Sequence, residues 1–162
     1  MKISKEKFKK VKEDAKKFYL KIGEVKCPYL KQKVHFNRKG FEHITTDGWN
    51  RGRTIREQSI RLKLLSKTVG VIEKSHTLQE YDERKIFVRQ NINSRWEKRL
   101  KRVQYFAFIS TYPSDGVRLK VVIEKIEGAS PVFLSVYPFW KVKNDINGNR
   151  RKVFYSGNMS GK

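Results

Sequence analysis

The residues best suited to chemistry in this sequence are a histidine, a serine and many cations. His43 follows a predicted turn at residues 38–40 and lies in a predicted short helix. Its imidazole can give or take a proton at neutral pH. Metal-free cleavage of RNA needs a base for the ribose 2′-OH proton, an acid for the leaving 5′ oxygen, and cations that stabilise the extra negative charge. A structural role is the alternative for His43. We expect His35 to be packed or hydrogen-bonded in its strand and His76 to lie in a loop.

Ser135 lies in a late apolar strand predicted at residues 132–137. Strict alternation would place Phe133, Ser135 and Tyr137 on one face and the three aliphatic residues on the other. If the aliphatic face is the core, Ser135 projects into a groove where a base could stack and the hydroxyl could hold a phosphate. The alternative is a strand buried on both faces, in which a neighbour satisfies Ser135.

Cations lie on the elements around these two residues. Arg118 and Lys120 share one face of a strand predicted within residues 117–126. A helix predicted over residues 54–69 has one apolar side and one basic side, the latter with Arg53, Arg56 and Lys63. Gln58 falls among the apolar positions of that helix, so its amide must be either a structural clamp or part of a site.

A second basic stretch follows, with Trp96 interleaved. Such a run favours contacts with a nucleic-acid backbone and carries no sequence-reading code. Its cations are Arg84, Arg89, Arg95, Lys98, Arg99, Lys101 and Arg102.

Most cofactor and metal signatures are absent from the sequence. It has no glycine-rich phosphate loop, dinucleotide fingerprint, paired-cysteine zinc site or His-Glu-x-x-His helix. Its three histidines are not close in sequence. We therefore expect no cofactor and no metal, and metal-dependent cleavage is disfavoured.

Net charge points to the partner. The chain has 38 Lys and Arg against 16 Asp and Glu, a formal charge of +22 on 162 residues. Self-repulsion of that size is usually neutralised by a polyanion, so we expect RNA, with DNA less favoured. The longest largely apolar run is too short to span a bilayer, so no membrane is expected. A single cysteine, Cys27, gives no sign of an oxidising compartment and favours a cytoplasmic protein.

The elements that position these residues are predicted from periodicity. A first helix is capped by Ser4 and stopped by Gly23, and a loop through Cys27 precedes a short strand at residues 34–36. After His76 the period becomes two, with strands at residues 85–89, 103–110, 117–126 and 132–137. Turns are expected at residues 113–116, 128–131 and 147–148, and a frayed tail at 156–162. Helices first and then a meandering antiparallel sheet indicate an α+β fold.

Six segments occur in a characteristic order: residues 34–43, 53–65, 78–81, 105–109, 118–122 and 133–140. In this order they resemble the phage-associated branch of the barnase, EndoU, colicin and RelE-like nuclease superfamily. The resemblance covers about residues 29–143, between a basic N-terminal helix and loop at 1–28 and a C-terminal hairpin or tail at 144–162.

The resemblance implies N-terminal helices packed on a four- or five-stranded antiparallel sheet, with a metal-independent RNA-cleaving site on the exposed sheet face. It implies a toxin-like or phage-derived enzyme, for which an acidic antitoxin or immunity protein is a possible partner. Position by position, it implies catalytic roles for His43, Arg61, Arg118 and Ser135. With the basic surface, the expected substrate-binding residues are Arg53, Arg56, Gln58, Lys63, Arg84, Lys120 and Tyr137.

Two other functions fit the same charge. A nucleic-acid-binding protein without catalysis would need no site at all, and it would bind RNA with steep salt dependence but produce no cyclic phosphate ends. A DNA-acting nuclease of a mobile element would act on a substrate without a 2′-OH.

Overall fold

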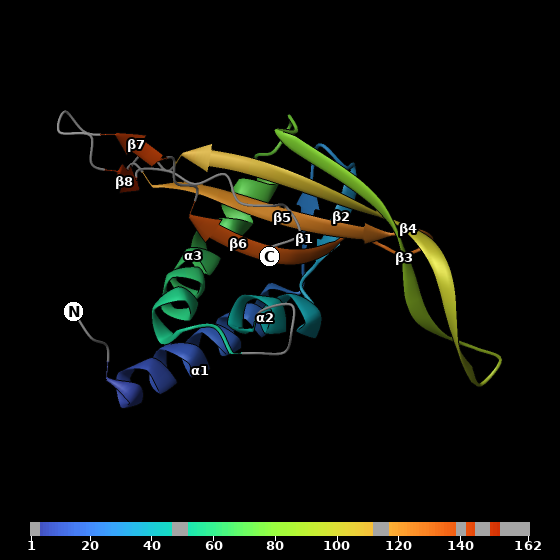
Figure 1. Ribbon diagram of the computed structural model, residues 1–162, viewed down its shortest axis with the longest axis horizontal. Helices are drawn as coiled ribbons and strands as arrows, with labels where there is room; N and C mark the ends of the chain where they lie inside the picture. Colours follow the sequence, from blue (N-terminus) through green and yellow to red (C-terminus); the bar gives the residue numbers. More distant parts are fainter. Residues whose placement is uncertain (1–3, 47–51, 112–116, 139–141, 145–149, 153–162) are drawn as a thin grey trace.

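The computed structural model describes residues 4–46, 52–111, 117–138, 142–144 and 150–152. In these ranges the chain forms three helices beside a curled six-stranded sheet, and a separate two-stranded ribbon (Figure 1). The helices are α1 (Lys5–Ile22), α2 (Arg38–Thr45) and α3 (Ile55–Glu73). The strands are β1 (Glu24–Cys27), β2 (Gln32–His35), β3 (Glu80–Ile92), β4 (Arg95–Thr111), β5 (Arg118–Ile126), β6 (Val132–Pro138), β7 (Val142–Asn144) and β8 (Arg150–Lys152).

The α+β class is confirmed, but the expected sheet of four or five antiparallel strands is wrong. The strand order is β1-β2-β6-β5-β4-β3, and β2 runs parallel to β6 through the pair His35–Val132. The other pairs in the sheet are antiparallel, which makes it mixed. The extra strand is β1, which lies where a loop through Cys27 was expected. It buries Val25 and Cys27, and two alternate apolar residues are too short a pattern to reveal a strand.

The helix ends follow the sequence signals. The Ser4 side chain accepts a hydrogen bond from the Lys7 amide, and Gly23 ends α1 with a φ of 64°. Thr54 and Glu57 form a reciprocal capping box at the start of α3. The turn expected at residues 38–40 is wrong, because Asn37 caps a helix there by accepting from the Gly40 amide at 3.3 Å.

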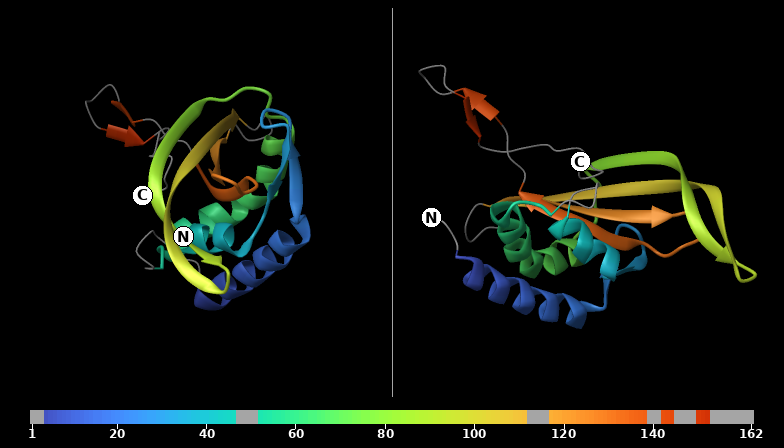
Figure 2. Two further views of the ribbon diagram at one scale, coloured as in Figure 1. Left: turned by 90° about the vertical axis from the view of Figure 1, so that its right-hand side faces the viewer. Right: turned by 60° about the horizontal axis from the view of Figure 1, so that its bottom comes forward.

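A long hairpin of β3 and β4 extends beyond the rest of the sheet (Figures 1 and 2). Its turn residues, Asn93 and Ser94, both have positive φ, 51° and 65°, as a two-residue hairpin turn requires. The turn expected at 128–131 is confirmed between antiparallel β5 and β6, with Gly128 at φ 79°. The turns expected at 113–116 and 147–148 and the tail at 156–162 lie outside the described residues, although the β7–β8 pairing brackets residues 147–148.

The sheet has two differently covered faces. The first, which we call the helix-covered face, packs Phe106, Phe108, Val121 and Ile123 against buried residues of α3 such as Leu65. The second face carries a smaller apolar cluster: Val103, Tyr105, Ala107, Val122, Leu134 and Tyr137. None of the helices in the described ranges has the length and apolar character needed to cross a membrane.

Helix α2 packs directly against β6 at Gly40. A methyl group on Gly40 would lie within 3.0 Å of the Phe133 carbonyl oxygen and of the Tyr19 hydroxyl. Backbone cannot yield to such a contact as a flexible side chain can. Tyr19 also donates a hydrogen bond of 2.6 Å to the Asn37 carbonyl, just before α2, so the position of the helix is fixed from two sides.

We expect Gly40→Ala to lower the free energy of unfolding by about 1–3 kcal/mol or more, because the gain in helix propensity is outweighed by overpacking. Chemical denaturation measures this change. Gly52→Ala is the matched control, since a methyl there meets no atom within 4 Å, and it should change stability by less than about 0.5 kcal/mol. Equal stability of the two variants would contradict the close approach of α2.

Candidate functional site

A polar cluster of the described residues lies around Tyr137 on the second face. Nη1 of Arg61 donates a hydrogen bond of 2.7 Å to Oγ of Ser135, and the guanidinium carbon lies 5.2 Å from the centre of the Tyr137 ring. Nζ of Lys120 lies 5.8 Å from the same ring centre. Lys120 and Tyr137 are register partners on adjacent strands. Two cations therefore converge on one aromatic ring.

The open edge of β6 explains how a side chain from α3 reaches this cluster. Within the described residues, β2 pairs with β6 only at Val132, so the rest of that edge is left to the helices. Leu62 and Leu65 hold α3 in the main core, while Arg61 reaches Ser135 on the second face. The alternation of β5 and β6 and their pairing put Ser135 and Tyr137 on that face with Lys120.

The environment of Arg61 disfavours its positive charge. Burial, and after it the positive charge of Arg53, lowers the pKa of Arg61 to about 10. A guanidinium with such a pKa is still charged at neutral pH, so the low value measures how poorly its charge is solvated. A bound anion would relieve both the desolvation and the repulsion. The cluster is therefore suited to holding a phosphate or another oxyanion.

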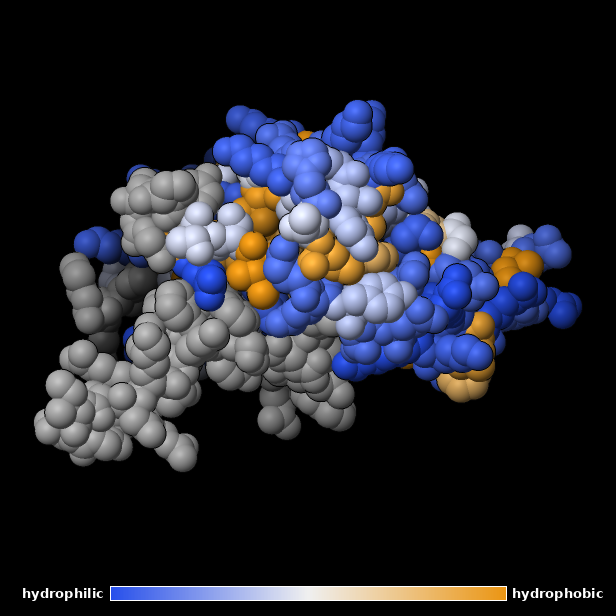
Figure 3. Space-filling model, turned by 90° about the horizontal axis from the view of Figure 1, so that it is seen from above, coloured by the Kyte–Doolittle hydropathy of each residue, from blue (hydrophilic) through white to orange (hydrophobic). Residues whose placement is uncertain are grey.

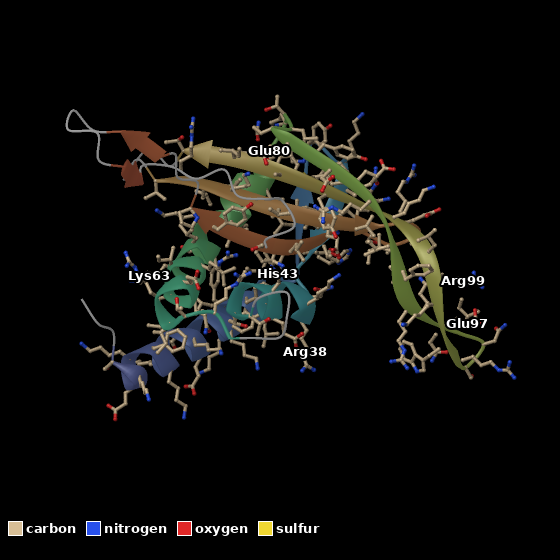
Figure 4. The ribbon with its side chains drawn as sticks, viewed as in Figure 1. Arg38, His43, Lys63, Glu80, Glu97 and Arg99 are labelled. Carbon is tan, nitrogen blue, oxygen red and sulfur yellow. The ribbon has the colours of Figure 1, made fainter. Side chains whose placement is uncertain are left out.

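Arg53 contacts the backbone of His43 and acts on Arg61 through its positive charge. Nε of Arg53 donates to the His43 carbonyl oxygen at 3.2 Å, and Nε2 of Gln58 donates to the Arg53 carbonyl oxygen at 2.6 Å. Gln58 is buried, and this hydrogen bond holds the backbone at Arg53 just before α3. His43 follows Gly40 by three residues, so the two share a side of α2, which Figure 4 shows beneath β6.

Two carboxylates accompany the cations on the second face. Oε2 of Glu80 lies 2.7 Å from Nζ of Lys120, whose side chain is fully buried. Glu124, itself 5 % exposed, pairs with Lys39 of α2. Burial, then the charge of Glu124 and its hydrogen bond, raises the pKa of Tyr105 to about 12. The cations of the second face are thus partly neutralised.

The remaining expected residues lie at varying distances from the cluster. Arg118 shares the second face with Lys120, at the start of β5. Arg84 also faces that side, but two strands away, where Nε pairs with Asp82 at 2.8 Å. Arg56 and Lys63 are exposed on α3, and Lys63 projects away from the sheet (Figure 4), so they are not brought to the cluster.

The sequence interpretation of Ser135 needs correction. Val122 pairs with Ser135 but Ile123 pairs with Phe133, so Leu134 is an extra residue that interrupts the alternation. Phe133 therefore packs in the main core and not beside Ser135. Ser135 has 0 % exposure, and its hydroxyl accepts a hydrogen bond from Arg61. The alternative of a strand buried on both faces is the one found.

Sequence reasoning overlooked four residues of this site: Lys39, Glu80, Tyr105 and Glu124. A signal existed for Glu124, because an acidic residue in an otherwise apolar strand must find a partner when it is buried. Lys39, Glu80 and Tyr105 gave no comparable signal, since a surface lysine, a strand-end glutamate and a core tyrosine are ordinary.

No metal centre is found in the described part of the chain, because it brings no three His, Cys, Asp or Glu residues together in a suitable group. Comparison with protein-family models, with curated proteins and with solved structures finds no match.

Neutralising Glu80 should destabilise the fold strongly. Glu80→Gln removes the carboxylate from the fully buried ammonium of Lys120, and we expect a loss of about 3–5 kcal/mol in the free energy of unfolding. The double variant Glu80→Gln with Lys120→Met should recover most of that loss, because it removes the buried charge as well.

Glu24→Gln is the control for this pair. It breaks an exposed ion pair with Lys33, also 2.7 Å long, and should cost far less stability than Glu80→Gln because solvent screens that pair. Urea denaturation of the four proteins measures all three differences. Similar losses in Glu80→Gln and Glu24→Gln would show that Lys120 is not effectively buried.

Proposed function

We propose that this protein is a metal-independent RNA endonuclease. The observation that carries the proposal is the poorly solvated Arg61 guanidinium, which contacts Ser135 and lies over the Tyr137 ring, with the Lys120 ammonium near the centre of the same ring. Anion binding is what such a pair of cations favours, and a net charge of +22 favours a polyanion as its source. RNA fits best because its own 2′-OH supplies the nucleophile, so that no metal is needed.

The reaction would proceed by transesterification. A base removes the ribose 2′-OH proton while that oxygen forms a bond to the adjacent phosphorus. The bond from phosphorus to the 5′ oxygen breaks, and an acid gives the leaving oxygen a proton. The products are a 2′,3′-cyclic phosphate and a free 5′-OH. His43 acts as the acid or the base, and the cations stabilise the charge that develops on the phosphate.

The residues of the proposed site would have different roles. Arg61 binds the phosphate, and Ser135 is a positioning residue that fixes the guanidinium and does not contact substrate itself. Lys120 contributes its positive field from a buried position beside Glu80. Arg118, at the end of the same face, extends the cationic path along β5. The guanidinium of Arg61 also makes a cation–π contact with the ring of Tyr137.

A toxin-like or phage-derived role, and an acidic antitoxin as partner, belong to this proposal through the family resemblance. The exposed cations suit an acidic protein surface by charge complementarity. Such a partner would act by covering the cationic surfaces, so it needs no chemistry of its own.

Cleavage of a 5′-labelled single-stranded RNA in EDTA tests the proposal. We expect cleavage with 2′,3′-cyclic phosphate ends, and none of a 2′-O-methyl RNA of the same sequence. His43→Ala should lower the rate about 10²–10⁴-fold, the usual contribution of an acid or base. Arg61→Met should lower it by about 10²-fold or more, because a transition-state contact is lost.

His76→Ala is the matched histidine control, since His76 is exposed between α3 and β3 and should leave the rate unchanged. RNA binding without cyclic phosphate ends would make the protein a non-catalytic binder. Cleavage of DNA that requires Mg²⁺ would point to a DNA nuclease. Full activity of His43→Ala would remove His43 from the mechanism.

A further inference from the structure

The projecting part of the β3–β4 hairpin has one face made of cations and exposed apolar side chains. Four register pairs form this face, which we call the arm face: Lys85–Arg102, Phe87–Leu100, Arg89–Lys98 and Asn91–Trp96. All eight residues are exposed. Phe87, Trp96 and Leu100 keep 72 %, 62 % and 55 % of their surface in contact with solvent.

Large exposed apolar side chains on a projecting hairpin indicate a binding surface, because they do not contribute to the main core. Figure 3 shows apolar and hydrophilic groups interleaved at this end of the molecule. Trp96 makes a cation–π contact with Arg89, whose guanidinium carbon lies 5.1 Å from the centre of the Trp96 ring. The arm face thus presents an ordered aromatic side chain among positive charges.

The charged residues of the arm face are all positive. This face carries four cations and no carboxylate, and at its base Arg102 lies 3.6 Å from Glu83. On the opposite face of the same hairpin, Glu97 lies 3.7 Å from Arg99, and both project from the hairpin in Figure 4. Charged residues on an edge strand can also serve to prevent aggregation, but that role requires no exposed Trp96 or Phe87.

We propose that the arm face binds a single-stranded segment of RNA, separately from the cluster around Tyr137. Sequence-tolerant binding of single strands combines a cationic track for phosphates with aromatic rings on which bases stack. Same-face residues along a strand are about 6.7 Å apart, close to the spacing of phosphates in an extended single strand. A hollow of about 360 Å³ at the base of the arm, lined by Lys85, Leu100, Lys101, Arg102 and Glu127, gives the strand a place to enter.

The inference rests on the proposed function for the identity of the partner, but not on cleavage. The arm would hold a long transcript while its scissile phosphate lies at the second face, so it would act on long substrates. An acidic protein is the competing occupant. We favour RNA because the arm face alternates cations with exposed apolar groups along its length, whereas a protein interface gathers apolar residues in a central core.

Binding of a labelled 20-nucleotide 2′-O-methyl RNA, followed by fluorescence anisotropy, tests the inference. The double variant Arg89→Ala/Lys98→Ala should weaken binding about tenfold and reduce the salt slope by about 1.4, because two phosphate contacts are lost. Trp96→Ala should weaken it about fivefold or more through lost stacking. The probe has no 2′-OH, so the outcome is independent of whether the protein cleaves RNA.

Arg95→Ala/Arg99→Ala is the charge-matched control, because it removes two cations from the opposite face of the same hairpin. It should weaken binding less than about threefold. Equal losses in the two double variants would show that only net charge matters and would overturn the inference. So would unchanged binding in the arm variants, or equally strong competition by poly-glutamate, which would assign the face to an acidic protein.

Discussion

The contact between α2 and the open edge of β6 is the constraint on which the site depends. Gly40 lets the helix approach the Phe133 carbonyl oxygen so closely that no larger residue fits. Because residues three and four apart lie on one side of a helix, this contact also sets the side of α2 that carries Lys39 and His43. Lys39 reaches Glu124 on the second face, and the segment after α2 brings Arg53 to the His43 carbonyl. A shift of the helix would therefore move the histidine and its surrounding cations together.

The two cationic regions, the cluster around Tyr137 and the arm face, differ in how far solvent reaches their charges. The cations of the arm face are exposed. Around Tyr137, Lys120 is fully buried and Arg61 is poorly solvated, so their interactions are strong and weakly screened by salt. Such burial is costly, and Glu80 and Ser135 offset part of the cost by direct contact. Among the described residues, no carboxylate hydrogen-bonds to Arg61, and this arrangement lowers stability. The phosphate binding that we propose would compensate for that loss.

The sequence predicts the elements whose signals are local. Helix ends at Ser4, Gly23 and Thr54 follow from capping chemistry, and the long apolar strands follow from alternation. It does not reveal the bulge at Leu134, because an inserted residue looks like any other until its partner strand is known. The contact between Arg61 and Ser135 joins residues 74 positions apart, so only the family resemblance placed both in one site. The sequence does not predict the tight turn at Asn93 and Ser94, because the residues around it form a charged run without clear alternation of apolar and polar positions.

The bulge at Leu134 determines which residues of β6 face the main core and which face the polar cluster around Tyr137. Without the bulge, regular alternation through Leu134 would put Phe133 and Ser135 on the same face of β6, and one of the two would leave its present environment. The extra residue lets Phe133 stack at 4.8 Å on Phe36 in the main core while Ser135 and Tyr137 both face Lys120. One strand can then serve the apolar core at its start and a polar cluster at its end. The position of Arg61 is consequently set by the backbone of β6 as much as by α3, because Ser135 holds the guanidinium. In the site that we propose, this strand would decide where a phosphate binds.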